Sequence, residues 1–284
     1  MSGSAESVLG FAVLLGAGAA LAGGMYLAGM WNDVMRPSRR GLGWALGQGF
    51  AASPSDLGLT FTERTHEFPG CTMPAWWVAG RAPESGTAVI LLHGHGRSRW
   101  DSLRRIQPIA AGAALVVVPD LRGHGDAPGR STLARREPAD VALLVAAIEA
   151  EHPGLRIVIA GHSMGAVVAI HAAALRAEAG SPIHAVTAWG PYDRVRTPFE
   201  ARLRLRGLPV RPFSDGVLAC WKLLDGPERA TTASAALLRD TTLGIHADAQ
   251  DPVSPMEDAE RISSASAGST VVRTVGVAHA DLGT

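Results

Sequence analysis

The chain has 284 residues, and its 26 Lys and Arg residues are balanced by 26 Asp and Glu residues, so the formal net charge is zero. A balanced chain has no basic footprint for a polyanion, and we expect no nucleic acid partner. Two cysteines, Cys71 and Cys220, are too few and too far apart for a disulfide scaffold or a metal site. We expect two free thiols, with a single bridge as the alternative. The length fits one large α/β domain and a membrane anchor.

Residues 1–35 predict an N-terminal membrane anchor. Residues 8–31 carry no charge, and a helix of this length spans a bilayer at ~1.5 Å per residue. The run is too long for the apolar core of a typical signal peptide, and no basic residue precedes it. Because Arg36, Arg39 and Arg40 follow it, the positive-inside rule predicts a single-pass protein with a cytoplasmic domain. A buried helix, an uncleaved leader and a leader removed from a secreted protein are the alternatives.

Small residues recur at every fourth position of this segment: Ala12, Gly16, Ala20, Gly24 and Ala28. Such a stripe lets transmembrane helices approach closely, which predicts a homodimer through the anchor. A chance pattern in a Gly/Ala-rich segment is the alternative interpretation.

Residues 36–57 read as a linker with one short helix near Trp44, and residues 58–284 read as one α/β domain. Residues 59–68 and 73–78 predict an antiparallel hairpin. Apolar runs then alternate with helical segments. The predicted strands are 88–92, 115–118, 156–160, 183–189, 242–246 and 270–275, and the predicted helices are 103–111, 138–151, 166–175 and 254–263. This rhythm predicts a mostly parallel sheet with helices on both faces.

Residues 191–237 interrupt the alternation of strands and helices. An insertion that follows the strand ending at Trp189 would lie over the C-terminal edge of the sheet, so we interpret it as a lid. We interpret its arginines as a solvated face, with contact to anionic lipid head groups as the alternative. These arginines are Arg194, Arg196, Arg202, Arg204, Arg206 and Arg211.

Residues 161–165 read Gly-His-Ser-Met-Gly, between a predicted strand and a predicted helix. A G-x-S-x-G pattern in this context is typical of a nucleophile elbow, with Ser163 as the nucleophile. The turn is sharp, and Gly161 and Gly165 have no Cβ to clash as the chain reverses. The segment therefore predicts a reactive serine at the C-terminal edge of the sheet.

A serine nucleophile needs a base and a carboxylate that orients the base. His279 follows the last predicted strand and is the predicted base. Asp251 follows the preceding strand and is the predicted acid, because it adjoins the turn that leads into the next helix. Asp248, three residues earlier, is its rival.

The oxyanion that forms during acyl transfer needs two N–H donors. The backbone of Met164 is one predicted donor, and the backbone of His95, in the glycine-rich loop after the strand 88–92, is the other. His93 and His95 as a metal pair are the less favoured alternative, because no carboxylate or cysteine lies nearby in sequence. We expect neither a metal nor another cofactor.

These motifs, in this order, resemble the α/β-hydrolase superfamily over about residues 58–284. Residues 93–96 (His-Gly-His-Gly) resemble its oxyanion loop, and residues 120–125 (Asp-Leu-Arg-Gly-His-Gly) its D-x-R-G-H-G segment. Residues 251–253 are similar to its acid turn and His279 to its histidine loop. The resemblance implies an α/β-hydrolase fold and gives Arg122 and His124 a structural role.

Within the superfamily, a serine nucleophile argues against the dehalogenase and epoxide-hydrolase branches, which use aspartate. Two features depart from the family pattern. The sequence ends five residues after His279, where relatives continue into a helix, so one face of the last strand is expected to be less covered. Residues 126–127 read Asp-Ala where a serine is common.

The sequence as a whole predicts a membrane-anchored serine hydrolase of the esterase and lipase type, with a small-molecule or lipid-like ester as substrate. Ser163 would form the acyl-enzyme and His279 would activate the water that releases the acid. A serine peptidase or thioesterase of the same fold is one alternative, because the same motifs serve all three. A non-catalytic, membrane-tethered binding module is another.

Overall fold

The computed structural model describes residues 2–284, and its centre is an eight-stranded sheet in the order β1-β2-β4-β3-β5-β6-β7-β8. The strands are β1 (Phe61–Phe68), β2 (Cys71–Ala79), β3 (Thr87–Leu92), β4 (Leu115–Pro119), β5 (Arg156–His162), β6 (Ala185–Trp189), β7 (Thr242–Asp248) and β8 (Ser269–Thr274). The predicted hairpin is confirmed, because β1 and β2 pair antiparallel. β2 also pairs antiparallel with β4, and all later neighbours are parallel.

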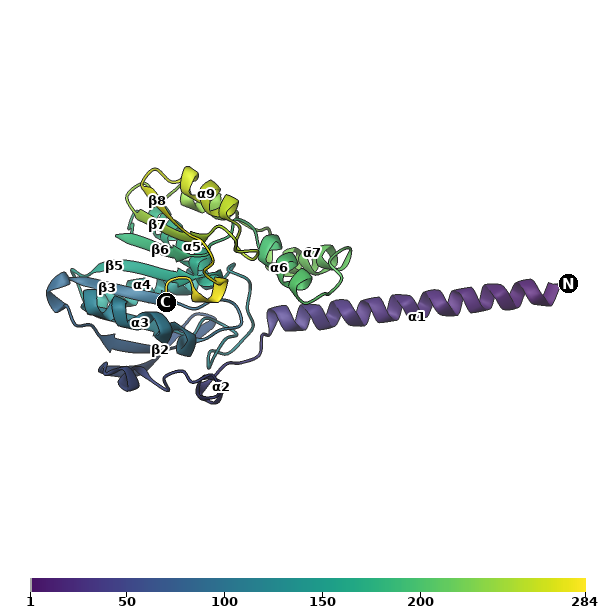
Figure 1. Cartoon of the computed structure of the whole chain (residues 1–284), viewed down its shortest axis with the longest axis horizontal. Helices are drawn as coiled ribbons and strands as arrows, with labels where there is room; N and C mark the ends of the chain where they lie inside the picture. The colour runs from purple at the N-terminus through teal and green to yellow at the C-terminus, as the bar shows by residue number, and fades with distance from the viewer. Residues whose placement is uncertain (1) are drawn as a thin grey trace.

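Helices cover both faces of this sheet (Figure 1). They are α1 (Ser2–Met35), α2 (Leu42–Gly47), α3 (Arg99–Gly112), α4 (Glu137–Glu151), α5 (Met164–Glu178), α6 (Arg196–Leu205), α7 (Phe213–Asp225), α8 (Thr231–Ala235) and α9 (Met256–Ala265). One core layer contains α4, α5 and α9, and the other contains α2 and α3. The predicted α/β fold, mostly parallel and covered on both sides, is confirmed. On β8, Val272 is 47% exposed, as expected for a less covered last strand.

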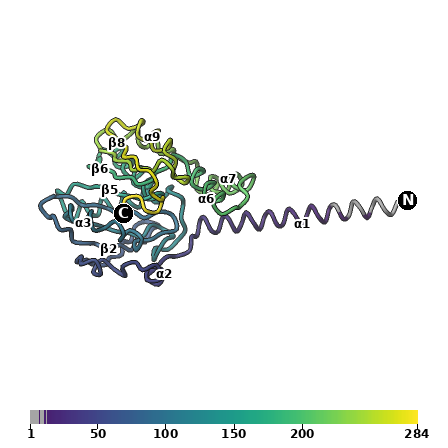
Figure 2. Tube along the Cα trace, in the orientation of Figure 1, coloured from purple at the N-terminus to yellow at the C-terminus, as the bar shows by residue number. Residues whose placement is uncertain are grey.

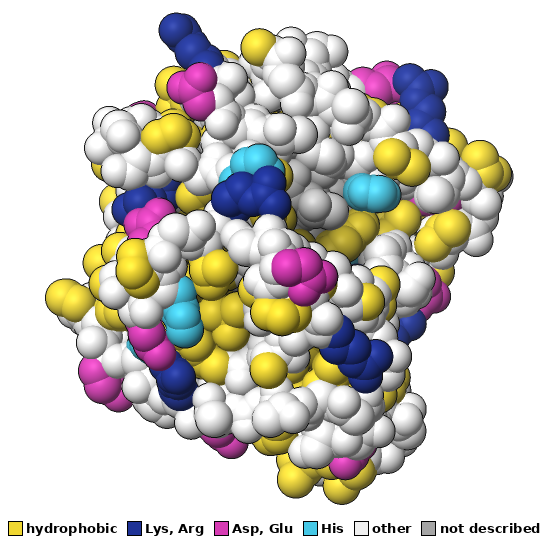
Figure 3. All heavy atoms as spheres, turned by 90° about the vertical axis from the view of Figure 1, so that its left-hand side faces the viewer, with side chains coloured by type: hydrophobic (Ala, Val, Ile, Leu, Met, Phe, Trp, Pro, Cys, Tyr) yellow, Lys and Arg dark blue, Asp and Glu magenta, His cyan; other side chains and the backbone are white. Residues whose placement is uncertain are grey.

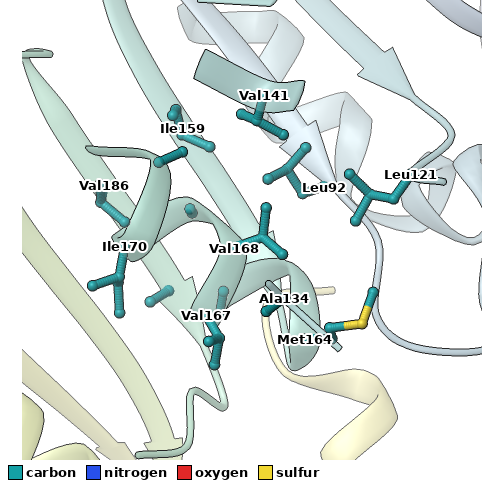
Figure 4. Packing of buried hydrophobic residues seen from close by; sticks show 14 of the residues in the cluster. Leu92, Leu121, Ala134, Val141, Ile159, Met164, Val167, Val168, Ile170 and Val186 are labelled. Carbon is teal, nitrogen blue, oxygen red and sulfur yellow. The ribbon is translucent and has the colours of Figure 1, made fainter. Parts of the chain in front are cut away.

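Helix α5 packs on the sheet, with Val168 beside Leu92 (Figure 4). Val168 and Ile170 of α5 are fully buried. Burial of each such side chain stabilises the fold by about 1.5–3 kcal/mol. The helix also packs against α4 and α8, which explains why its residues 164–174 are buried all round. This packing fixes the start of α5, where the predicted nucleophile lies.

Helix α1 projects from the domain as a long rod (Figure 1). Within it, Val13–Met35 is long and apolar enough to cross a membrane, a criterion that an N-terminal signal sequence also meets. Its apolar residues Phe11, Leu14, Leu15, Leu21 and Met25 are 58–72% exposed.

The last turns of α1 are part of the domain core. Met30 is 7% and Met35 is 1% exposed. The amide of Ser131 donates to the carbonyl oxygen of Met35 at 2.8 Å, and the ring of Tyr26 packs edge-on against Phe213 of α7 with centroids 4.8 Å apart. The segment predicted as an anchor of residues 1–35 therefore shares its end with the α/β domain.

The segment predicted as a linker, residues 36–57, lies against the domain surface. It contains the helix expected near Trp44, α2, and a short 3-10 helix at Pro54–Leu57. Arg39 donates to the carbonyl of Ala127 at 2.8 Å, and the indole of Trp100 donates to the carbonyl of Ala52 at 2.8 Å. These contacts hold the segment beside the loops that surround the site.

The insertion predicted as a lid forms α6, α7 and α8, between β6 and β7. Figure 1 shows α6 and α7 beside the domain end of α1. Trp221 of α7 is 1% exposed and its indole donates to the carbonyl of Thr132 at 3.1 Å. Asp225 accepts two hydrogen bonds of 2.8 Å from Arg130. The insertion is thus fastened to the loop that precedes α4.

The surface facing away from α1 carries scattered charges of both signs between small apolar patches (Figure 3). Both cysteines are free thiols, as predicted. Cys71 is buried, and burial raises the pKa of its thiol to about 12. Cys220 is exposed on α7.

Candidate active site

Ser163 has the strained backbone of a sharp turn between β5 and α5, with φ +55° and ψ −116°. A Cβ on Gly161 would lie 2.2 Å from the carbonyl oxygen of Gly165, and a Cβ on Gly165 would lie 2.6 Å from that of His93. Both positions therefore exclude any side chain. A non-glycine residue keeps such a φ only where its surroundings impose it, which is common at functional sites.

The structure brings Ser163, His279 and Asp251 together. Nε2 of His279 lies 2.9 Å from Oγ of Ser163, and Nδ1 of His279 lies 2.5 Å from Oδ2 of Asp251. Since the carboxylate can only accept, Nδ1 carries the proton and Nε2 is free to take one from the serine. Ser163 is 1% and Asp251 is 6% exposed, so the pair of hydrogen bonds is shielded from water.

Backbone amides hold Asp251 in place. Its Oδ1 accepts from the amides of Val253 and Ser254 at 2.8 and 3.2 Å, which leaves Oδ2 for the histidine. The rival Asp248 has a different role. It accepts from the amide of Val277 at 2.9 Å and is turned toward the loop before His279. The structure thus places Asp251, and not Asp248, at the histidine.

The loop of His279 is positioned by residues to which the sequence motifs assign no role. The ring of His162 donates from Nε2 to the carbonyl oxygen of His279 at 2.6 Å. Arg105 of α3 donates to the carbonyls of Leu282 and Ala280 at 2.9 and 2.8 Å. The chain ends beside α3 for this reason (Figure 2). These contacts join residues more than 100 positions apart, and no local pattern marks them.

The predicted oxyanion loop crosses directly over the elbow. A Cβ on Gly94 would lie 3.3 Å from Cβ of Ser163, so the loop backbone passes close to the nucleophile. His95 follows it, and Met164 is the first residue of α5, where amide groups have no partner within the helix. The backbone donors of His95 and Met164 stay predictions.

The imidazoles of the loop are engaged with backbone groups. His95 donates from Nε2 to the carbonyl oxygen of Val34 at the end of α1, at 2.8 Å. His93 donates from Nδ1 to the carbonyl of Gly94 at 2.9 Å and accepts at Nε2 from the amide of Leu121 at 3.0 Å. Burial lowers the pKa of His95 to about 3 and that of His93 to about 4. Both rings are therefore neutral structural groups, not the metal pair considered as an alternative.

Within residues 2–284, no cluster of three or more potential metal ligands occurs. In the D-x-R-G-H-G segment, Arg122 forms two hydrogen bonds of 2.6 Å with Asp140 of α4. The ring of His124 donates to the carbonyl of Arg122 at 3.0 Å. Both side chains stabilise the loop, in agreement with the structural role that the resemblance implied.

Two adjoining cavities lie beside His95, and one of them reaches His279. A cleft of about 600 Å³ is lined by His279 and its neighbour Ala280, by the loop after β3, by the end of α1 and by α6. A smaller cavity of about 120 Å³ lies between α1 and α6 and is lined largely by apolar side chains. Asp33, His95, Arg202 and Arg206 line both and separate them.

The sheet is mostly parallel, and a strained serine follows its fifth strand, β5. A histidine and an aspartate lie on later loops. This arrangement defines a hydrolase of the α/β class. Comparison with protein families agrees, because residues 89–282 match the alpha/beta hydrolase family. The chain belongs to this family.

Solved structures with the same fold include an esterase and a thioesterase domain. The esterase of Pyrococcus furiosus is 22% identical, with a TM-score of 0.64 over 81% of this chain and 86% of that one. An alpha-beta hydrolase from Vibrio vulnificus is 16% identical, with a TM-score of 0.63 over 89% and 84%. A thioesterase domain from the curacin biosynthetic pathway is 15% identical, with a TM-score of 0.54 over 78% and 94%.

One curated relative is more similar, but only locally. A stretch of 50 residues is 44% identical to the magnesium-chelatase 30 kDa subunit of Rhodobacter capsulatus. The stretch covers 18% of this chain and 17% of that protein. Together the comparisons show a hydrolase of this fold family.

Proposed function

We propose that this chain is a membrane-anchored serine hydrolase that cleaves carboxylic esters through an acyl-enzyme on Ser163. The observation that carries the proposal is the position of His279, which is within hydrogen-bonding distance of both Ser163 and Asp251. A buried serine of this kind becomes nucleophilic when the base removes its proton in the transition state.

In the first half-reaction, the proton of Ser163 Oγ moves to Nε2 of His279 as Oγ attacks the ester carbonyl carbon. The amides of Met164 and His95 donate to the oxyanion of the tetrahedral intermediate. The carbon–oxygen bond to the alcohol then breaks, and His279 returns the proton to the leaving oxygen. Asp251 stabilises the imidazolium throughout.

In the second half-reaction, His279 takes a proton from water, and the resulting hydroxide attacks the acyl carbon. The intermediate collapses, the bond to Oγ breaks, and His279 gives its proton back to Ser163. The products are the free acid and the regenerated serine. The steps need no metal or other cofactor.

The anchor part of the proposal rests on α1. Its exposed apolar residues project away from the domain, whereas Met30 and Met35 are buried within it. Cleavage beyond these residues would remove part of the core, which favours a retained anchor over a removable leader. The basic residues that follow α1 favour a cytoplasmic domain, and the small-residue stripe favours a homodimer through the anchor.

The test is a series of p-nitrophenyl esters of increasing chain length, with an aminoacyl p-nitroanilide and an acyl thioester alongside. The proposal predicts the highest kcat/KM on an ester and loss of turnover in Ser163→Ala. Preference for the anilide or the thioester would assign a peptidase or a thioesterase instead. A folded protein that cleaves none of them would be a binding module.

A further inference from the structure

The cleft beside His279 is strongly basic. It lies between the end of α1, the loop after β3, the helix α6 and the loop of His279. Five arginines line it and only one carboxylate: Arg36, Arg40, Arg97, Arg202, Arg206 and Asp33. A cleft lined by one sign of charge attracts ligands of the opposite sign.

Arg202 differs from the other arginines of the lid insertion. Arg194, Arg196, Arg204 and Arg211 are 38–69% exposed, and each lies within 4.0 Å of a carboxylate. Arg202 is partly buried, and within the part of the chain that the structure describes it makes no side-chain hydrogen bond or ion pair. Arg202 therefore differs from the exposed and paired arginines of the predicted solvated face.

Several charged groups act on Arg202. Burial lowers the pKa of its guanidinium, and the positive charges of Arg206 and Arg97 act in the same direction, while Tyr192 and Asp251 oppose them. A guanidinium that has no carboxylate partner and faces a cleft of mostly positive charge is available to a bound anion. Arg206 likewise has no ion-pair partner among the described side chains, whereas Arg97 pairs with Asp101 at 3.4 Å.

The smaller cavity on the other side of Arg202 has a different chemistry. Apart from the four residues that it shares with the cleft, it is lined largely by apolar side chains, among them Met30, Leu133, Phe199, Leu203 and Leu208. His279 does not line it. An acyl chain fits such a lining, and a charged group does not.

The chemistry of the triad orients the substrate between the two cavities. His279 must protonate the leaving oxygen, so the alcohol portion lies on the side of His279. That side is the basic cleft. The acyl portion then extends toward the apolar cavity beside His95.

We propose that the substrate is an ester whose alcohol portion carries an anionic group, a phosphate, sulfonate or carboxylate, that pairs with Arg202 and Arg206 while the acyl chain occupies the apolar cavity. This inference rests on the proposed esterase function. Arg202 suits the task because a guanidinium offers two parallel N–H donors to such a group. Arg202 determines specificity and does not touch the reacting atoms.

The test compares a neutral soluble ester with two related esters that carry one anion each, on the alcohol side or on the acyl side. Phenyl butyrate is neutral, 4-sulfophenyl butyrate has its anion on the alcohol side, and monophenyl glutarate has its anion on the acyl side. Rates are normalised to hydroxide hydrolysis, because the sulfonate also activates the leaving group. The wild type should prefer 4-sulfophenyl butyrate over phenyl butyrate by about 10- to 100-fold in kcat/KM, and should not prefer the glutarate.

Variants of Arg202 assign this preference to one side chain. Arg202→Gln should reduce the ratio of the two kcat/KM values, 4-sulfophenyl butyrate over phenyl butyrate, to about the ratio seen in hydroxide hydrolysis. Arg202→Lys should keep part of the preference. The matched control is Arg204→Gln, because the Arg204 side chain is on the same helix but is 62% exposed and paired with Glu200. It should behave as the wild type. An equal preference in wild type and Arg202→Gln would overturn the inference and leave the esterase proposal intact.

Binding gives a readout that does not depend on turnover. Calorimetry of Ser163→Ala with 4-sulfophenyl butyrate should show binding that the added Arg202→Gln change weakens by at least about 10-fold. No binding overturns the inference, whatever the activity. Comparison of kcat/KM for a lysophosphatidylglycerol and for a monoacylglycerol of equal chain length then identifies the source of the anion. Preference for the former indicates a lipid, and no preference a soluble ester.

Discussion

Asp251→Asn should nearly abolish ester hydrolysis without unfolding the protein. The amide keeps the shape of the carboxylate, but it can present an N–H donor where Oδ2 now accepts from His279 at 2.5 Å. His279 would then hold its proton on Nε2 and offer Nδ1 to the amide. With the proton on Nε2, it can no longer accept the proton of Ser163, which lies 2.9 Å away.

The size of the effect follows from this change of tautomer. In serine proteases the equivalent substitution lowers kcat by about 10⁴. A factor of 10³–10⁴ corresponds to about 4–5.5 kcal/mol of lost transition-state stabilisation. The substrate makes no contact with Asp251, which lies behind the histidine, so KM should change by less than about threefold. The fold should persist, because Oδ1 continues to accept from the amides of Val253 and Ser254.

The assay is steady-state hydrolysis of p-nitrophenyl butyrate by the full-length protein in detergent, with circular dichroism to verify folding. Asp248→Asn is the matched control, because Asp248 accepts from Val277 and Thr274 in the same loop but not from His279. It should lower Tm and keep kcat within about tenfold. If Asp248→Asn removed activity and Asp251→Asn did not, the assignment of the acid would be wrong.

Three further predictions concern the anchor, the buried histidines and the oxyanion loop. Removal of residues 1–25 should leave a folded enzyme. Removal of residues 1–35 should lower the free energy of unfolding by about 3–6 kcal/mol, because it removes the buried Met30 and Met35. Equal Tm values for the two truncated proteins would show that α1 does not contribute to the core. Lowering the pH from 7 to 5 should lower Tm, because histidines of the unfolded chain bind protons near pH 6.5 and five histidines of the folded chain do not, each contributing up to about 1.4 kcal/mol per pH unit. Burial lowers the pKa of His162 well below its usual value and that of the other four to about 3 or 4: His93, His95, His124 and His171. The raised pKa of Asp120, about 6, offsets a part of this loss below pH 6, and a Tm that rises on acidification would refute the reasoning. Gly94→Ala should reduce kcat by about 10- to 100-fold with little change in Tm, because the added Cβ would lie 3.3 Å from Cβ of Ser163. Unchanged kinetics would show that this loop does not take part in the active site.

The parts of the site that the sequence predicts are those governed by local sterics. The elbow is one, because a Cβ on Gly161 would lie 2.2 Å from the carbonyl oxygen of Gly165 within the same turn. The order of strands and loops also places His279 at the correct edge of the sheet. The sequence distinguishes Asp251 from Asp248 less clearly, because two carboxylates three residues apart differ only in the direction in which the turn points them.

Tertiary contacts decide what the sequence leaves open. An apolar helix end is equally suited to lipid and to a protein core, so the burial of Met30 and Met35 has no local signal. The same holds for Arg105, which fixes the histidine loop from α3. It holds again for Arg202, whose neighbours on α6 are all paired or exposed. The six arginines of the insertion look alike in sequence, and only packing shows that Arg202 is partly buried and unpaired.

The most direct measurement is labelling of the purified protein by a fluorophosphonate probe, which reacts only with an activated serine. Ser234→Ala serves as the control beside Ser163→Ala, because Ser234 also bonds to a buried histidine, with its Oγ 2.7 Å from Nδ1 of His171, but lies outside the elbow. The account predicts labelling of the wild type and of Ser234→Ala, and none of Ser163→Ala. A folded wild type that takes no label, or a Ser163→Ala variant that is labelled as strongly, would contradict it.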